Sequence, residues 1–276
     1  MQIQIETITP AIARAMLENN DHNRRLAPSH VRRYAADMAA GQWTINGEAI
    51  KIDTAGNLLD GQHRLAAIIV ANVAVKTVVA RGLDVGTRLT MDQGRKRTTG
   101  DQFKLRGIQY PDVHACAAAH LYRWEYGAKW GNTNNLIASV SELLDTRDRW
   151  PELAEACALG VSTSRAFRCG VGQGTWAGAY AVALAVNADR ARSFAEQCRT
   201  GAGLAIGSPV LALRNSFVAF RHSGRTLTRA HALNWIVIAF FDFLDGKSRR
   251  QFKRDQRVRD FRNVEGRRIV RPEVAQ

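Results

Sequence analysis

The stretch of sequence that decides the fold is AIKIDTAGNLLDGQHRLAAIIVA, residues 49–71. Its first part, AIKID, alternates apolar and polar side chains as a half-buried strand does. AGN at 55–57 predicts a turn, and the two leucines after it resume an extended segment. From residue 62 to about residue 71 the apolar residues recur at helical spacing. The order strand, turn, strand, helix places the polar run DGQHR, residues 60–64, where a strand meets a helix.

The flanking sequence continues this alternation of strands and helices. Thr9 and Ser29 each stand where a helix N-cap is expected, and Gly41 follows the second of these helices. A segment rich in β-branched residues, VKTVVARGL, predicts another strand. The elements expected here are strands over 3–8 and 75–83, and helices from Pro10 to about Glu18 and between Ser29 and Gly41.

Beyond about residue 106 the strand signal fades and helical patterns take over. The helices are expected near 111–126, 134–146, 151–159, 173–187, 188–200, 208–221 and 228–244. The aromatic residues of the last helix, among them Trp235 and Phe240, are interpreted as core. The predicted fold class is α+β, with an N-terminal α+β domain followed by an all-α C-terminal domain. The expected divisions are 1–105, a helical domain over 106–246, and a basic tail over 247–276.

Composition limits the class of protein. The chain has 276 residues, of which 46% are hydrophobic, so it can bury substantial cores. The start of the chain has no signal-peptide pattern, and its apolar runs are too short to span a bilayer. We therefore expect a cytoplasmic protein with no membrane partner. Four widely spaced cysteines form no CxxC pair and are expected to be reduced thiols.

The net charge of +14 is unevenly distributed. Residues 247–276 carry 11 basic and 4 acidic side chains, which accounts for half of the net charge. Such a tail can contact nucleic-acid phosphates without reading sequence. It can equally dock on the helical domain through its two phenylalanines, Phe252 and Phe261. The candidate DNA-binding residues are Arg249, Arg250, Lys253, Arg254 and Arg257.

The DGQHR run has two interpretations on local physics, a turn with a helix cap or a phosphate cradle. Gly61 allows a ligand to approach the backbone closely, and the first turn of a helix favours an anion. His63 and Arg64 add a polar donor and a fork-shaped cation suited to phosphate oxygens. Asp60 can orient His63, cap the helix or coordinate a magnesium ion.

LLDGQHRLAAI after AIKID resembles the nucleotide-binding motif of the ParB/sulfiredoxin superfamily. The spelling DGQHR is most similar to the phage and mobile-element proteins named after it, a group that includes relatives of DndB. Asn23 and Arg24 resemble the upstream Asn–Arg element of ParB-like domains, and MDQGRKRTTGDQF (91–103) resembles a downstream segment of DGQHR proteins. The resemblance covers roughly residues 1–105. It departs from ParB in lacking a clear helix-turn-helix, and from sulfiredoxin in having Gln62 in place of the reactive cysteine.

The resemblance implies a nucleoside triphosphate, ATP or CTP, together with Mg²⁺. It implies that Asp60, Glu48 and His63 are the catalytic candidates and that Asp60 is the metal ligand. In this interpretation the protein is an enzyme, a Mg-dependent NTPase or a kinase-like phosphotransferase, acting in DNA metabolism or DNA modification of a phage or mobile element. The implied nucleotide-binding residues are Asn23, Arg24, Gly61, Gln62, His63, Arg64, Asp92, Arg95 and Arg97.

Two alternatives stay open at the level of sequence. The first is a non-catalytic DNA-binding protein that uses the nucleotide as a switch or not at all. The second is a ParB-like nuclease, which would need clustered carboxylates for two-metal chemistry. The sequence also leaves open whether the chain forms a homo-oligomer.

Overall fold

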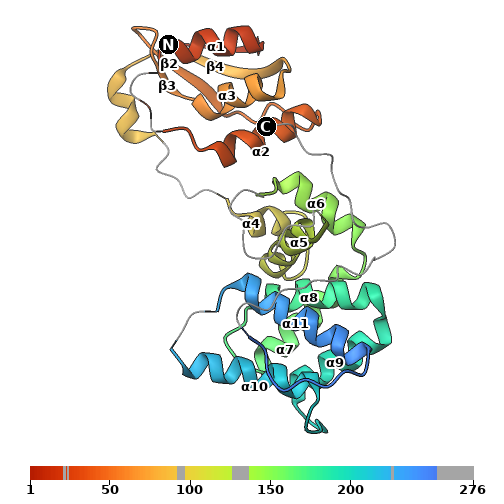
Figure 1. Ribbon diagram of the computed structural model, residues 1–276. Helices are drawn as coiled ribbons and strands as arrows, with labels where there is room; N and C mark the ends of the chain where they lie inside the picture. Colours follow the sequence, from red (N-terminus) through yellow and green to blue (C-terminus); the bar gives the residue numbers. More distant parts are fainter. Residues whose placement is uncertain (21–22, 24, 92–96, 126–136, 225–226, 254–276) are drawn as a thin grey trace. The chain divides into compact units, whose positions relative to one another are not determined.

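The computed structural model divides the chain into two compact units, Met1–Lys96 and Arg97–Gln276. Figure 1 shows a small sheet with helices in the first unit and helices alone in the second. The mixed α+β class predicted from the sequence is therefore confirmed. The residues that the structure describes are 1–20, 23, 25–91, 97–125, 137–224 and 227–253.

The first unit is built on a mixed four-stranded sheet of order β1-β4-β2-β3. β1 and β4 are antiparallel, β2 and β4 are parallel, and β2 and β3 form an antiparallel pair. Its elements are β1 (Gln2–Ile8), α1 (Pro10–Glu18), α2 (Pro28–Ala39), β2 (Ala49–Asp53), β3 (Leu58–Asp60), α3 (Gln62–Ala71), β4 (Val75–Leu83) and the 3-10 helix η1 (Val85–Thr90).

The turn between β2 and β3 is held by a buried carboxylate. Asp53 Oδ1 accepts hydrogen bonds from the backbone N–H of Ala55 and of Asn57, both at 2.8 Å. Its Oδ2 accepts from the side-chain amide of Asn57 at 2.9 Å. These hydrogen bonds, that of the Asn57 side chain above all, lower the pKa of Asp53 despite its burial. Asp53 is thus a turn residue.

One hydrophobic cluster holds the first unit together. Figure 1 shows α1, α2 and α3 around the sheet, and buried side chains of these helices and of the strands form this cluster. Ile8 of β1, Ile50 of β2 and Leu65 of α3 are fully buried there. The alternation of the strands and the helical spacing after Gly61 thus supply one shared core.

Two expectations for this region are wrong in detail. α2 begins at Pro28 with Ala27 as its N-cap, not at Ser29, because a proline favours the first helical position. The boundary between the units falls at residue 96 instead of 105. The helix α4 (Thr99–Lys104) belongs to the second unit, because Phe103 is fully buried in the helical core.

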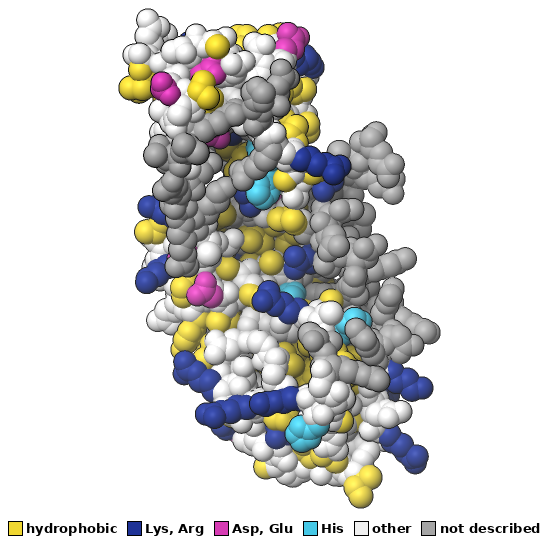
Figure 2. Space-filling model, turned by 90° about the vertical axis from the view of Figure 1, so that its left-hand side faces the viewer, with side chains coloured by type: hydrophobic (Ala, Val, Ile, Leu, Met, Phe, Trp, Pro, Cys, Tyr) yellow, Lys and Arg dark blue, Asp and Glu magenta, His cyan; other side chains and the backbone are white. Residues whose placement is uncertain are grey.

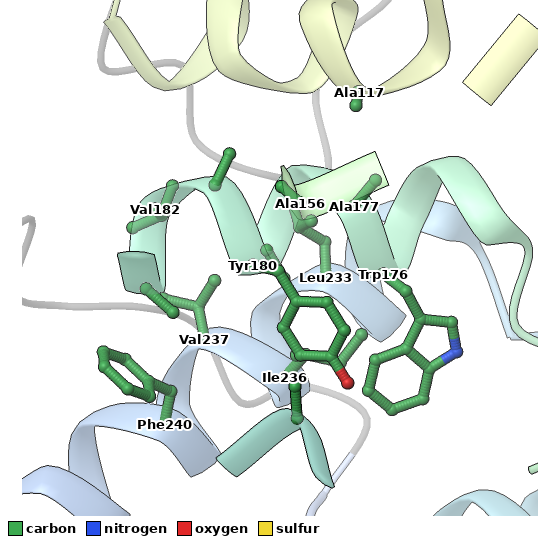
Figure 3. Close-up of a cluster of buried hydrophobic side chains, with 14 of the residues drawn as sticks. Ala117, Ala156, Trp176, Ala177, Tyr180, Val182, Leu233, Ile236, Val237 and Phe240 are labelled. Carbon is green, nitrogen blue, oxygen red and sulfur yellow. The ribbon is translucent and has the colours of Figure 1, made fainter. Parts of the chain in front are cut away.

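Helices are the regular elements of the second unit in its described residues. Its hydrophobic cluster includes Trp176 and Tyr180 of α8, and Figure 3 shows Tyr180 projecting toward Ile236 of α11. The hydroxyl groups of Tyr180 and Thr163 are hydrogen-bonded at 3.0 Å, so this buried phenol has a polar partner. Besides α4, its helices are α5 (Pro111–Glu125), α6 (Val140–Arg149), α7 (Leu153–Ala166), α8 (Gln173–Val186), α9 (Ala188–Thr200), α10 (Pro209–His222) and α11 (Arg229–Leu244).

Glycines let α8 approach its neighbours closely. A Cβ on Gly160 of α7 would lie 2.7 Å from the backbone nitrogen of Ala177 in α8. A Cβ on Gly174 of α8 would lie 2.4 Å from the Cβ of Cys116 in α5. Both distances are shorter than real Cβ contacts, so any larger residue would push the helices apart.

The tail expected over 247–276 is partly built into the helical core. Phe252 is buried, and its backbone N–H donates to Ser216 Oγ at 3.0 Å. The indole N–H of Trp235 donates to the carbonyl oxygen of Lys253 at 2.9 Å. The expected separate tail is therefore wrong for 247–253, because Phe252 anchors this segment; residues 254–276 lie outside the described residues.

α5 also carries a buried histidine, His120, whose pKa is lowered to about 3 by burial and, to a smaller extent, by Arg123 and Arg229. In the unfolded chain its pKa is about 6.5. The unfolded state therefore takes up a proton first as pH falls, and stability is lost between about pH 6.5 and 3.

We expect the free energy of unfolding to fall by about 2 kcal/mol from pH 7 to pH 5 through His120 alone. Urea denaturation at several pH values measures this slope, to which burial of His114 adds in the same direction. The variant His120→Gln should show a flatter pH profile whatever its stability at pH 7. An unchanged profile would contradict the assignment.

None of the helices in the described part of the chain combines the length and apolar character needed to span a membrane.

Candidate functional site

The DGQHR run lies where the sequence predicts it, at the junction of β3 and α3. Asp60 ends β3, Gly61 turns the chain, and α3 begins at Gln62. Gly61 has φ +111°, in the region that favours glycine, and no side chain caps α3. Its Cα faces Ile50 so closely that a Cβ would lie 3.1 Å from Ile50 Cγ1. The turn therefore requires glycine for both its conformation and its packing.

The Asp60 carboxylate ties this junction together. Its Oδ1 accepts from the backbone N–H of Gly61 at 2.7 Å. Its Oδ2 lies 3.1 Å from Arg64 Nη2 and 3.7 Å from Lys51 Nζ. Asp60 thus joins β2, β3 and the first turn of α3 through two cations.

The guanidinium group of Arg64 already forms hydrogen bonds within the protein. It donates from Nη1 to the carbonyl oxygen of Glu48 at 2.6 Å and from Nη2 to that of Ala49 at 2.9 Å. Its side chain is 11% exposed. The guanidinium therefore fastens the start of β2 to α3, and a bound phosphate would have to share or exchange these hydrogen bonds.

The segment between α1 and α2 is hydrogen-bonded to the same junction through asparagines. Asn23 Nδ2 donates to the carbonyl oxygen of Leu58 at 2.7 Å and to Asn20 Oδ1 at 2.6 Å. Asn20 Nδ2 donates to Oε1 of the buried Gln62 at 3.1 Å. Asn23, which was predicted from the motif, thus reaches β3, and Asn20 reaches α3.

His63 faces the start of α2. Its Nε2 accepts a hydrogen bond from the backbone N–H of Ala27 at 3.0 Å, so this nitrogen carries no proton here. Its ring centroid lies 5.7 Å from that of His30. Acid–base chemistry at His63 Nε2 would require this hydrogen bond to break.

The structure brings together most of the predicted nucleotide-site residues of the first unit. The side chain of Glu48 is exposed, and its backbone carbonyl oxygen accepts a hydrogen bond from Arg64. Arg97 is exposed and belongs to the second unit. Sequence reasoning missed Asn20 and Lys51; the asparagine-rich run at 19–23 was the available signal for the first. The predicted residues Arg24, Asp92 and Arg95 lie outside the described residues.

The chemistry of Asp60 does not suit a magnesium ion held by the protein. Two cations already flank its carboxylate. In the parts of the chain that the structure describes, no group of three or more His, Cys, Asp or Glu side chains could hold a metal. Mg²⁺ prefers oxygen ligands and is often held mainly by substrate phosphates. Asp60 as a metal ligand stays a prediction.

The predicted DNA-binding residues differ in whether their side chains contact other residues of the protein. Arg249 pairs with Asp242 and lies 4.5 Å from the ring centroid of Phe252, which ties it to the helical core. Arg250 and Lys253 are exposed. On the face shown in Figure 2, the Lys and Arg side chains lie in separate spots, with no single continuous patch among the described residues. Arg254 and Arg257 lie outside the described residues.

No known family model matches this chain, and no curated protein or solved structure is significantly similar to it.

Proposed function

We propose that the first unit binds a nucleoside triphosphate, ATP or CTP, with its phosphates at the first turn of α3. The observation that carries this proposal is the Gly61 turn. It opens α3 without a side-chain cap, and no acidic residue stands in the first turn. Backbone amides at the start of a helix favour an anion, and glycine lets one approach closely.

The surrounding side chains have separate roles in this proposal. Arg64 and Lys51 place two cations beside the turn, and Asp60 orients both. Asn20 contacts α3 and Asn23 contacts β3, so that these two side chains form one wall of the site. Gln62 and His63 act as positioning residues through Asn20 and Ala27.

We further propose hydrolysis of the nucleotide or transfer of its phosphoryl group, in DNA metabolism or DNA modification of a phage or mobile element. Glu48 is then the better candidate base, because its side chain is exposed whereas Asp60 is committed to Arg64 and Lys51. Mg²⁺ would enter with the nucleotide and neutralise phosphate charge.

We expect ATP or CTP with Mg²⁺ to bind the wild-type chain, and Arg64→Ala to weaken binding about tenfold or more, since it removes a charge-assisted donor. Calorimetry with ATP, ADP, CTP and GTP measures this at a temperature where circular dichroism shows both proteins folded. Arg81→Ala is the matched control, because Arg81 pairs with Glu6 on β1, away from α3. The control should bind within about twofold of the wild type.

Absence of binding by every nucleotide would overturn the proposal, as would equal losses in both arginine variants. If binding occurs, analysis of the products separates hydrolysis from transfer. Glu48→Gln should then abolish turnover while nucleotide affinity is retained.

A second candidate function is DNA binding with the nucleotide as a switch. Exposed Arg250 and Lys253 favour it, together with the 11 basic residues over 247–276. Deleting 254–276 keeps the anchor Phe252 in place. We expect this deletion to weaken binding of a DNA duplex and to reduce its salt dependence, while nucleotide affinity stays unchanged. Equal DNA affinity in both proteins would contradict this function of the tail.

A further inference from the structure

The second unit contains a cavity of about 320 Å³ that the nucleotide proposal does not use. It lies among α8, α10, α11 and the segment that precedes α8. Val171, Phe217 and Phe220 supply apolar surface, and Cys169 lies beside them. Its volume is at the lower end of the range for small-molecule sites. The cavity can therefore hold a compact molecule with one ring or a short branched chain.

The charged groups of this cavity are all positive. Arg221 and Arg229 line it, and its described lining contains no Asp or Glu. Arg229 is exposed and forms no ion pair or hydrogen bond with any described residue. Arg221 donates one hydrogen bond to the carbonyl oxygen of Arg168, which leaves its other guanidinium donors available. An uncompensated pair of arginines at an apolar cavity favours an anionic ligand.

A hydroxyl group in the cavity wall adds a polar contact point. Thr175 of α8 lines the cavity and is only 2% exposed. Its hydroxyl forms no hydrogen bond with any residue that the structure describes. Because Thr175 lines the cavity, its hydroxyl can donate to or accept from a polar atom of a ligand bound there.

We propose that this cavity binds a small organic anion, with its apolar body against Phe217 and Phe220, its carboxylate or phosphate group at Arg229, and a polar atom at Thr175. The site lies wholly in the second unit and does not depend on the nucleotide proposal. Its ligand class follows from the pairing of aromatic walls with unopposed cations.

The test compares two probes with the same body and different charge. We expect 3-phenylpropionate to bind the full-length chain at least tenfold more tightly than 3-phenylpropionamide, by calorimetry or saturation-transfer NMR at low salt. Phenyl phosphate, used as a third probe, distinguishes a phosphate preference from a carboxylate preference. Equal affinities for the acid and the amide, or no binding of any probe at 10 mM, roughly the weakest useful affinity, would overturn the proposal.

Substitutions in the cavity wall test whether the probes bind there. Arg229→Gln should weaken 3-phenylpropionate about tenfold and leave the amide unaffected, and Thr175→Val should weaken both probes. Arg192→Gln is the matched control, since it removes the same charge from an exposed pair with Glu155. Melting curves show whether each variant is folded. Equal losses in Arg229→Gln and Arg192→Gln would mean that the effect is only one of net charge, and would overturn the site.

Discussion

Replacing Glu125 by alanine is expected to lower the free energy of unfolding of the helical unit by about 3–5 kcal/mol. Glu125 ends α5 and its side chain is fully buried. Its carboxylate accepts from Arg149 Nε at 2.9 Å, from Arg149 Nη2 at 2.5 Å and from Trp150 Nε1 at 2.9 Å. Alanine would leave the buried Trp150 indole N–H and the guanidinium without these partners.

Glu155→Ala is the matched control, because Glu155 forms the same two-point contact with Arg192 on the surface of the same unit. Both members of that pair are about half exposed, with 51% for Arg192 and 42% for Glu155. Water and salt screen such a pair, so its loss should cost at most about 1 kcal/mol. Urea denaturation followed by tryptophan fluorescence measures both variants. If both variants lost a similar free energy of unfolding, burial would not be what makes the Glu125 interactions stabilising.

The sequence predicted best those elements whose boundaries are encoded locally. α3 and β4 begin and end where the helical spacing and the β-branched run predict them. Thr9 caps its helix as expected, with a hydroxyl oxygen that accepts from Ile12 N, and Thr228 caps α11 in the same way through His231 N. These signals need no knowledge of distant residues.

The predicted helix bounds were wrong where distant contacts or competing local signals determine where a helix begins or ends. A helix was expected near 151–159, but α7 continues through Gly160 to Ala166. A glycine reads as a stop signal locally, whereas here it allows the close crossing with α8 at Ala177. α6 was expected near 134–146 and runs over Val140–Arg149. There, Ser139 and Glu142 form a capping box that fixes its start.

At the candidate site, too, some features are encoded locally and others depend on distant contacts. The position of Gly61 at the start of α3 follows from local sequence. The partners of Arg64 do not, because the carbonyl groups of Glu48 and Ala49 are brought to it only by the pairing of β2 with β3. Hence the sequence could predict that the 60–64 run lies at the site, but not that Asn20 and Lys51 join it or that Arg64 and His63 already have partners within the protein.

Gly61→Ala separates the two reasons for glycine at this site, and we expect a loss of about 2–4 kcal/mol in the stability of the first unit. A side chain at φ +111° costs about 1–3 kcal/mol. Contact of the new Cβ with Ile50 adds about 1–3 kcal/mol. Reduced freedom of the unfolded chain offsets about 0.4–1 kcal/mol of this loss.

Gly56→Ala is the control that measures the cost of a positive φ without a new Cβ contact. Gly56 also has a positive φ, +87°, but a Cβ there would meet nothing within 4 Å. It should therefore cost only about 1–2 kcal/mol and leave nucleotide affinity unchanged. Gly61→Ala should reduce both stability and affinity, because Ile50 lies under the turn that presents the first amides of α3. If both variants lose the same stability and neither loses affinity, the close approach at Gly61 serves the fold alone, and the phosphates must bind elsewhere.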